Sequence, residues 1–209
     1  MRVAIHQPHY MPWLGYLRKI KEVDIFVYLD NVNYVRHRFQ NRNRILLNGK
    51  EHWLTIPVRT NQNKPIKDVK VNWDNTWNLK QYRTLLHGYK EQIKDKKEII
   101  EEFFLHDDEL LVDWCVRSID LLCDVFGIKV EKVFESSLKI DATGTERLVN
   151  ICKALKADAY LTGFEHKDYI KEEMFGDIKF EYMDWIPESQ LSALHFYLMD
   201  EIEALGKDN

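Results

Sequence analysis

The hydrophobic and polar positions at the start of the chain alternate between short apolar runs and one amphipathic stretch. Residues 2–8 contain an apolar run that stops at a proline, and residues 24–30 contain a run that is apolar on both faces. Between them, residues 13–23 carry apolar side chains at helical spacing after Pro12. Two such strands joined by a helix predict a βαβ unit with parallel strands, which are buried on both faces.

The middle of the chain follows a different pattern. Two β-rich runs flank Asn48-Gly49 within residues 43–58, which predicts a hairpin with a tight turn. Residues 66–73 predict one more strand. Residues 76–126 predict consecutive helices, the last of which carries a wide apolar stripe and ends near Gly127.

Alternating strands and helices return after this helical stretch. We expect a helix capped by Thr143 or Thr145 over residues 144–155, and another over residues 166–175. The strands are expected within residues 129–137, 158–163 and 178–183.

The predicted fold is α/β, with a mostly parallel sheet and flanking helices in a single domain. The sheet core takes in residues 1–34 and 128–185, and a hairpin and helical insertion of about residues 35–126 interrupts it.

Composition excludes several classes of protein. A net charge of −4 over 209 residues lacks the broad basic field of a general nucleic-acid binder, so no nucleic-acid partner is expected. The three cysteines, Cys115, Cys123 and Cys152, have no metal-finger spacing and are expected to be reduced and buried. No run approaches the ~20 apolar residues of a membrane span, and the N-terminus lacks a signal-peptide pattern. We therefore expect a cytoplasmic protein that does not insert into membranes.

Polar residues gather where the predicted parallel strands end. Ligands of open parallel sheets bind at the carboxyl ends of the strands, so these positions indicate a binding site. They are His6, Gln7 and His9 after the first strand, Asp30 after the second, Ser136 and Ser137 after the third, and Thr162 and Gly163 after the fourth.

His6 and His9 admit three interpretations: metal ligation, hydrogen bonding to buried backbone groups, and ligand binding or proton transfer. An HxxH spacing in a turn, without a carboxylate or cysteine partner, argues against a metal centre, and we predict none. Imidazole titrates near physiological pH and here precedes a helix N-terminus, which favours proton transfer or anion binding. Tyr10 is a further ligand candidate, whereas Trp13 is expected to pack in the core.

Residues 36–44, RHRFQNRNR, form a local basic stretch in an acidic protein. One interpretation is a solvated loop. The other is a site for one anionic small molecule, in which guanidinium groups bind phosphate or carboxylate and the interleaved amides bind a sugar or base. The candidate side chains are Gln40, Asn41, Arg42, Asn43 and Arg44.

Two other segments are weaker candidates. Ser136 and Ser137 are not surrounded by a nucleophile elbow, so a cap or a ligand hydrogen bond is the better interpretation. Gly163 and Lys167 flank a predicted helix start, where backbone amides can contact phosphate. No Walker motif, GxGxxG or HExxH occurs in the sequence.

Together, several of these segments resemble the WbqC-like family of bacterial proteins. The resemblance is carried by AIHQPHYMPWLGYLRKIKEVDIFVYLDNVNY, RFQNRNRI, WLTIPV and AYLTG, and it runs from residue 2 to about residue 198. The positions that match the family's motifs are His6, Gln7, Pro8, Tyr10, Pro12, Trp13, Gly15, Tyr16, Asp30, Phe39, Gln40, Asn41, Arg42, Asn43, Arg44, Thr55, Pro57 and Val58.

This resemblance implies a role in O-antigen and surface polysaccharide biosynthesis. The expected activity is that of a transferase that adds an acyl or aminoacyl (glycyl) group from an activated donor to the amine of a nucleotide-linked amino sugar. In this scheme Arg42 and Arg44 hold the pyrophosphate, and His6 or His9 removes a proton from the attacking ammonium. Gln7, Gln40 and Asn41 orient the sugar or base.

The sequence departs from the family's pattern at two places. Where the family tends toward SGxGG, this chain has Thr162-Gly163-Phe164-Glu165-His166, which lacks the glycines of a phosphate-binding loop. Where the family tends toward LSxxD, His195 stands in place of the aspartate, so a carboxylate role at this position is lost or altered.

Two alternative functions stay open at this point. A strand that ends in a histidine-containing turn is similar to the HIGH-type nucleotidyltransferases, which implies ATP-dependent adenylation with Mg²⁺. The other alternative is a non-catalytic sugar-nucleotide-binding subunit. No cofactor is expected outside the adenylation alternative.

Overall fold

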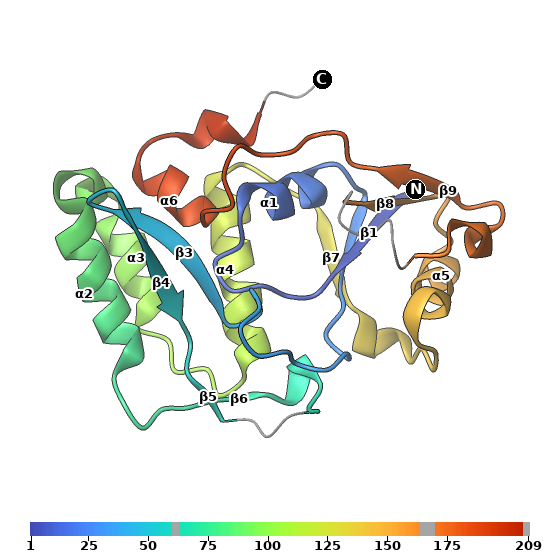
Figure 1. The fold of residues 1–209 in the computed structure, drawn as a ribbon, viewed down its shortest axis with the longest axis horizontal. Helices are drawn as coiled ribbons and strands as arrows, with labels where there is room; N and C mark the ends of the chain where they lie inside the picture. Colours follow the sequence, from blue (N-terminus) through green and yellow to red (C-terminus); the bar gives the residue numbers. More distant parts are fainter. Residues whose placement is uncertain (60–62, 164–169, 207–209) are drawn as a thin grey trace.

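The computed structural model describes residues 1–59, 63–163 and 170–206. Its central element is a parallel sheet with the strand order β7-β2-β1-β8-β9 (Figure 1). The strands are β1 (Arg2–His6), β2 (Ile25–Tyr28), β7 (Glu131–Phe134), β8 (Ala159–Thr162) and β9 (Lys179–Tyr182). The α/β fold with a parallel sheet, as predicted from the sequence, is confirmed.

The strand order reverses direction at one point. From β1 the chain continues outward through β2 and β7, and then crosses to β8 and β9 on the other side of β1. The pair β1 and β8 is therefore the switch point of the sheet, where connections leave in opposite directions and open a crevice beyond the strand ends.

Alternate residues of β1 face two different hydrophobic layers. Ala4 packs with α1 (Leu14–Lys21) and α4 (Leu111–Val125), whereas Val3 and Ile5 pack with α5 (Gly144–Ala154). Helices therefore cover both faces of the sheet, as the two-sided apolar strands require. His6 follows Ala4 in the alternation and faces the α1 side.

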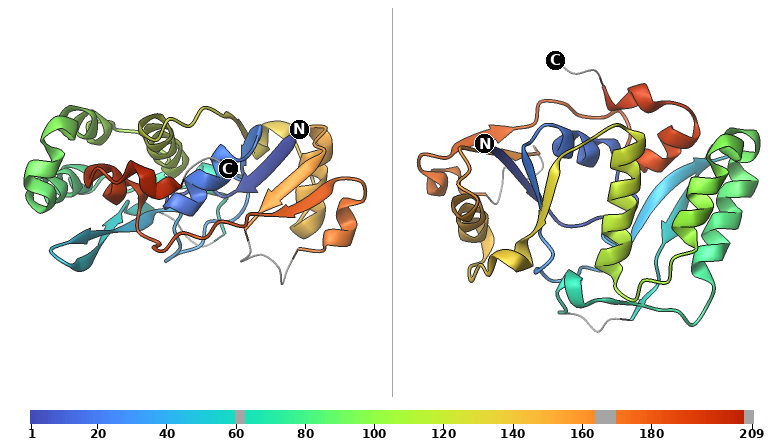
Figure 2. Two further views of the ribbon diagram at one scale, coloured as in Figure 1. Left: turned by 90° about the horizontal axis from the view of Figure 1, so that it is seen from above. Right: turned by 180° about the vertical axis from the view of Figure 1, so that it is seen from behind.

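The predicted insertion between β2 and β7 is present. It contains the hairpin of β3 (Arg42–Leu47) and β4 (Lys50–Thr55), and its turn residues Asn48 and Gly49 have φ of 50° and 74°. Two positive φ values are typical of the tight turn expected for Asn-Gly. The helices α2 (Trp77–Tyr89) and α3 (Lys97–Phe104) lie on one side of this hairpin (Figure 2).

Shorter elements complete the described part of the chain. The strand expected over residues 66–73 is a 3-10 turn followed by the two-residue strand β6, and the part of the expected 166–175 helix that is described contains only a 3-10 helix. These elements are β5 (Val58–Arg59), β6 (Lys70–Val71), α6 (Ala193–Leu198) and 3-10 helices at Ile66–Asp68, Lys90–Lys96, Glu135–Leu138, Glu172–Phe175 and Ile202–Leu205.

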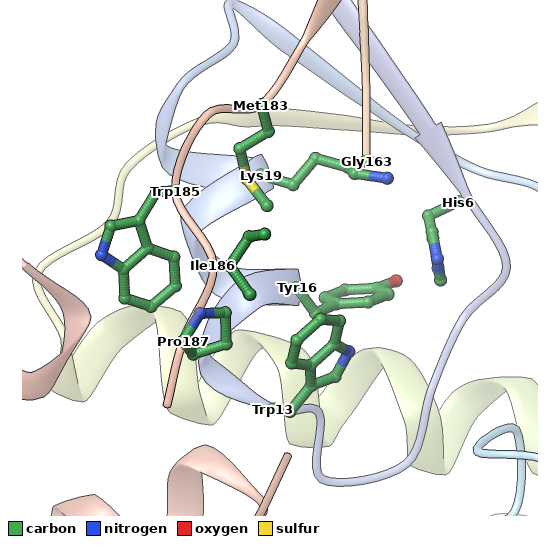
Figure 3. A pocket seen from close by; sticks show the side chains of 10 residues that line it. His6, Trp13, Tyr16, Lys19, Gly163, Met183, Trp185, Ile186 and Pro187 are labelled. Carbon is green, nitrogen blue, oxygen red and sulfur yellow. The ribbon is translucent and has the colours of Figure 1, made fainter. Parts of the chain in front are cut away.

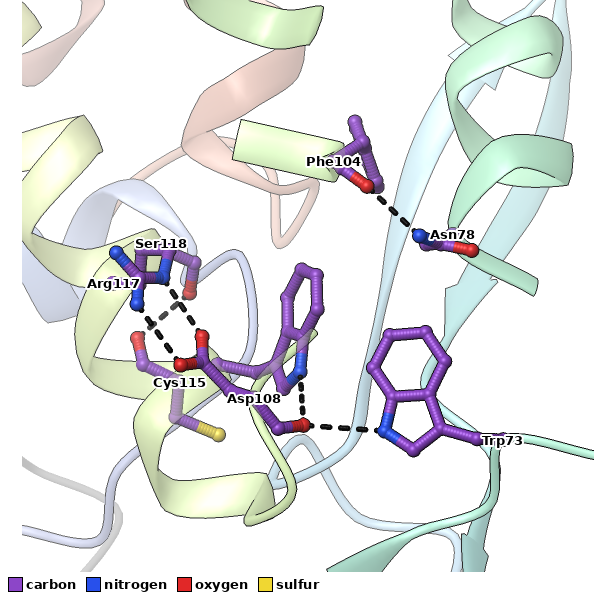
Figure 4. A network of polar contacts seen from close by, with 8 residues as sticks. Trp73, Asn78, Phe104, Asp108, Cys115, Arg117 and Ser118 are labelled. Atoms are coloured by element: carbon purple, nitrogen blue, oxygen red, sulfur yellow. Dashed lines mark hydrogen bonds and ion pairs between the residues drawn. The ribbon is translucent and has the colours of Figure 1, made fainter. Parts of the chain in front are cut away.

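A polar network fixes the insertion's helices to its loops (Figure 4). The Asp108 carbonyl accepts hydrogen bonds from Nε1 of Trp73 (3.3 Å) and of Trp114 (3.0 Å). Its carboxylate accepts two more from Arg117, at 2.9 and 3.0 Å. Because both donors of the guanidinium fork are used, α4 is held in a defined position relative to the loop before it.

One continuous hydrophobic cluster extends from the α1 side of the sheet into the insertion. It contains Phe26 of the sheet, Leu17 of α1, Ile119 of α4 and Ile45 of the hairpin. Trp13, expected in the core, is only partly buried and packs on the edge of this cluster. No helix in the described ranges is both long and apolar enough to cross a membrane.

Candidate functional site

A cleft of about 770 Å³ opens at the carboxyl ends of β1 and β2, and its volume is typical of small-molecule sites. The end of β1 contributes Ile5, His6 and Gln7. The other walls come from the segment 29–39 and from residues 143–148 at the start of α5. The cleft thus lies where the strand ends of an open parallel sheet predict a ligand.

The charge of the cleft differs from that of the protein as a whole. Arg38 and Arg147 line it, and none of its described lining residues is acidic, in a chain with a net charge of −4. The N-terminus of the eleven-residue helix α5 contributes Thr143, Gly144 and Thr145. Unsatisfied amides and the dipole at a helix N-terminus add a positive potential. The cleft therefore favours an anionic ligand.

Arg147 is held rigidly at the cleft wall. Its guanidinium donates to the carbonyl of Ala142 (2.6 Å) and to that of Asn31 (2.9 Å). Behind it, the Glu135 carboxylate lies 3.9 Å from Nη1 and is fully buried, and desolvation raises the pKa of this carboxyl group. Arg147 consequently joins the ends of β2 and β7 to the start of α5.

A second, smaller pocket of about 90 Å³ lies on the α1 side of His6 (Figure 3). Its walls are mostly aromatic and aliphatic side chains, and the Lys19 side chain extends across it toward Gly163 at the end of β8. The side chains around it are His6, Trp13, Tyr16, Lys19, Met183, Trp185, Ile186 and Pro187. His6 is the one described residue that lines both cavities.

Two histidines and a tyrosine form a compact group at this boundary. The ring centroids of His6 and His9 are 4.7 Å apart, and Tyr16 lies 4.9 Å from His6 and 5.3 Å from His9. Nδ1 of His6 lies 3.1 Å from the carbonyl oxygen of Gln7. A carbonyl can only accept, so this contact places the His6 proton on Nδ1 and leaves Nε2 as the basic nitrogen.

His9 has a different environment. It is buried, and desolvation together with the Lys19 charge lowers its pKa to about 3. Among the described residues its Nδ1 has no hydrogen-bond partner. His9 is therefore a neutral imidazole near pH 7 and a poor base, with its Nδ1 buried at the cleft wall.

Gly15 explains how the small pocket keeps its shape. A Cβ added to this residue would lie 2.7 and 2.8 Å from two atoms of the Trp13 ring. Only a glycine lets the indole lie across the first turn of α1, where it forms one wall of the pocket.

Comparison with known proteins shows which family the chain belongs to. A sequence model of the WbqC-like protein family matches residues 7–196. The chain belongs to the WbqC-like protein family. It is 26% identical over 181 residues to the uncharacterized protein Rv1507c of Mycobacterium tuberculosis, a match that covers 85% of this chain and 78% of that protein. No solved structure matches the chain.

The family match begins at Gln7 in the turn after β1, and the structure brings part of this turn to the cleft together with His6. His6, Gln7 and His9 all line the cleft. Tyr10, the other candidate in this turn, is fully buried, and its hydroxyl donates to Oε1 of Gln81 at 2.8 Å. It stacks on Phe103 and faces away from the cleft.

The amides of the WbqC-like motif RFQNRNRI lie inside the protein. Nε2 of Gln40 donates to Oε1 of Gln7 (2.7 Å), while its Oε1 accepts from the Val35 amide. Asn41 donates to the Ile56 carbonyl and Asn43 to the Met11 carbonyl. These bonds connect the hairpin to the turn after β1, so the amides position the site's backbone.

The basic side chains of the same motif have partners on the hairpin. Arg42 lies over the Trp53 ring at 4.2 Å and donates to the His37 carbonyl, and Arg44 pairs with Glu51 at 3.0 Å. Neither arginine lines the cleft, and Thr55, exposed at the end of β4, does not line it either.

The structure places the other strand-end candidates in different surroundings. Asp30 is buried and accepts from the Ser136 amide (2.9 Å) and hydroxyl (2.6 Å), which joins β2 to β7. Ser137 is exposed and donates to the Phe134 carbonyl. Thr162 is buried, Gly163 lines the small pocket, and Lys167 lies outside the described residues.

Sequence reasoning missed several residues that line the two cavities. Arg38 lies in the basic stretch 36–44 but is not among the candidates predicted there, and Arg147 follows a helix start with no distinguishing motif. Residues 183–187 had no functional signal at all, and the fold alone places them opposite α1. Within the described ranges no three metal-ligating side chains come together.

Proposed function

We propose that this WbqC-like protein is a transferase that adds an acyl or aminoacyl group to the amine of a nucleotide-linked amino sugar, in the assembly of O-antigen or a related surface polysaccharide. The observation that carries the proposal is the large cleft, lined by Arg38, Arg147 and the α5 N-terminus and without an acidic side chain among its described residues. A nucleoside diphosphate is an anion of suitable size for such a cleft.

The apolar part of the cleft supports the same ligand class. Val35, Phe39 and Leu148 offer flat or aliphatic surface near the charged groups. A base or sugar ring can pack there while its diphosphate faces the α5 N-terminus. Gln7 and His9 supply the neutral hydrogen-bonding groups that orient a sugar.

His6 is the base in this proposal. Its position between the two cavities allows an amine from the cleft to meet an acyl group from the other side. His9 is less suited, because its pKa of about 3 leaves it almost no affinity for a proton near pH 7. The cationic cleft also disfavours a protonated amine, which makes it easier for His6 to remove a proton from it.

The reaction is a simple acyl substitution. The amine nitrogen attacks the acyl carbonyl carbon of an ester or thioester donor, the C–N bond forms, and the bond from that carbon to the leaving group breaks. The leaving group departs with the electron pair. The nitrogen loses two protons between ammonium and amide; His6 passes one to solvent and the other to the leaving group.

The test is His6→Gln, compared with His87→Gln on the exposed surface of α2. With UDP-, dTDP- and GDP-linked amino sugars and a thioester donor, we expect the His6 variant to lose about 100-fold or more in kcat, as for loss of a general base. The Kd for the sugar nucleotide should change little, and the His87 variant should match the wild type.

Three outcomes would contradict the proposal. Turnover of His6→Gln at the wild-type rate would remove His6 as the base. ATP-dependent pyrophosphate release that stops on chelation of Mg²⁺ would favour adenylation instead. Binding of sugar nucleotides without turnover by the purified protein would favour a non-catalytic subunit.

A further inference from the structure

The small pocket on the α1 side of His6 has no ligand assigned to it by the proposed reaction. It is separate from the large cleft, and among the described residues only His6 borders both. Its other described walls come from Trp13, α1, Gly163 and residues 183–187, none of which lines the cleft. What binds in this pocket therefore meets the cleft's ligand at His6.

The volume of the pocket limits its ligand. An apolar cavity of about 150 Å³ holds a benzene ring, so about 90 Å³ holds about three or four non-hydrogen atoms. A sugar ring or a nucleotide is too large. A two- or three-carbon acyl group with its carbonyl oxygen fits this size.

The walls of the pocket match such a group in chemistry. The indoles of Trp13 and Trp185 and the side chains of Met183 and Ile186 present carbon surface around the space (Figure 3). Burial against this surface stabilises an alkyl chain by the hydrophobic effect. The imidazole of His6 lies across the pocket from Trp185 (Figure 3), and there the carbonyl carbon would meet a nucleophile.

We propose that this pocket is the acyl-group subsite and that Trp13, held by Gly15, sets the upper limit on acyl length. The assignment rests on the proposed function, because it takes His6 as the meeting point of donor and acceptor. It goes beyond that function by restricting the donor to short acyl chains of about three or four non-hydrogen atoms.

The first experiment measures binding alone. Acetyl, propionyl, butyryl and hexanoyl thioesters of N-acetylcysteamine are titrated into the protein, with the heat of binding in isothermal titration calorimetry as the readout. We expect acetyl and propionyl to bind and hexanoyl to bind about tenfold or more weaker, because an overfilled pocket must distort its walls. Affinity that rises steadily with chain length would overturn the assignment.

The second experiment locates the limit. Trp13→Ala should bring hexanoyl binding within about threefold of propionyl binding, since it removes one of the two indoles that line the pocket. Ile186→Ala, at a side chain that is 72% exposed, widens the same pocket without removing a buried contact. Trp53→Ala on the hairpin is the matched control and should keep the wild-type limit. An unchanged limit in both pocket variants would overturn the assignment.

The two proposals fail in different ways. A chain-length limit that moves with Trp13 but no transfer to any amino sugar would leave the subsite standing and remove the proposed reaction. Transfer that accepts hexanoyl as readily as acetyl would leave the reaction standing and remove the subsite.

Discussion

Two histidines three positions apart differ in what they can do because their surroundings differ. His6 lies between two cavities, with its Nδ1 at the Gln7 carbonyl, whereas His9 is buried behind it. The turn between them brings both rings to within 4.7 Å of each other. Chemical identity is the same at both positions, and burial is what lowers the affinity of His9 for a proton.

The lowered pKa of His9 predicts a pH-dependent stability. An unfolded histidine binds a proton near pH 6.5 but the folded one only near pH 3, so the stability is complete above 6.5 and falls as the pH drops toward 3. This single group should cost about 2 kcal/mol of unfolding free energy between pH 7.5 and pH 5. Urea denaturation at both pH values measures it.

The control for this prediction is a pair of variants. His9→Gln should lose the pH-dependent part of about 2 kcal/mol, whereas His87→Gln should keep it, since His87 is exposed. An equal pH dependence in wild type and His9→Gln would show that other groups cause the acid sensitivity.

The Asp30–Ser136 pair gives a second prediction at this scale. Ser136→Ala removes a hydroxyl donor to a buried carboxylate and should lower the unfolding free energy by about 1–3 kcal/mol. Ser137→Ala, next to it, removes an exposed hydroxyl and should cost less. Chemical denaturation of both variants tests the difference, and equal losses would argue against a structural role for the pair.

At the scale of elements, the first helix acts as a wall of the site. α1 is short, and its N-cap residue Trp13 makes no side-chain cap bond, so tertiary packing keeps it in place. The Trp13 ring lies over Gly15 and faces residues 183–187 across the pocket. The helix therefore carries both core residues and a ligand-facing surface.

Gly15→Ala tests this role of the helix. The new Cβ would lie 2.7 Å from the Trp13 ring, so the indole must shift and the pocket must change shape. We expect propionyl thioester binding to weaken several-fold, although alanine itself favours the helix by about 1 kcal/mol. In Gly88→Ala of α2 the new Cβ meets Leu47 instead, so this control should lose stability but retain propionyl binding.

On the scale of the whole molecule, the fold concentrates positive charge in an acidic protein. Arg38 comes from the loop after β2, Arg147 from α5, and the helix N-terminus from the same crossover. Arg38 and Arg147 are more than 100 positions apart in sequence, and they meet because β2 and β7 are neighbours in the sheet. Charge in a cleft with apolar walls acts more strongly than the same charge on an open surface.

Anion selectivity follows from this arrangement. UDP should raise the melting temperature more than uridine does, with about 2.7 kcal/mol of added stability at 100 times its Kd, and added salt should weaken the effect. Arg38→Gln should reduce the UDP shift, while Arg83→Gln on the exposed face of α2 should not. Equal shifts by UDP and uridine, at low and high salt, would contradict a diphosphate site.

Local pattern determined the elements of this protein, and tertiary structure determined the site. The apolar runs, the Asn48-Gly49 turn and the helical stripes predicted the sheet and its insertion, because hydrophobic periodicity and turn chemistry act over a few residues. They also predicted a site at His6 and His9, since ligands bind at the carboxyl ends of parallel strands. The sequence could not show that Arg42 and Arg44 pair on the hairpin or that Arg147 faces the cleft. Those contacts join distant segments, and only the packing of the sheet brings them together.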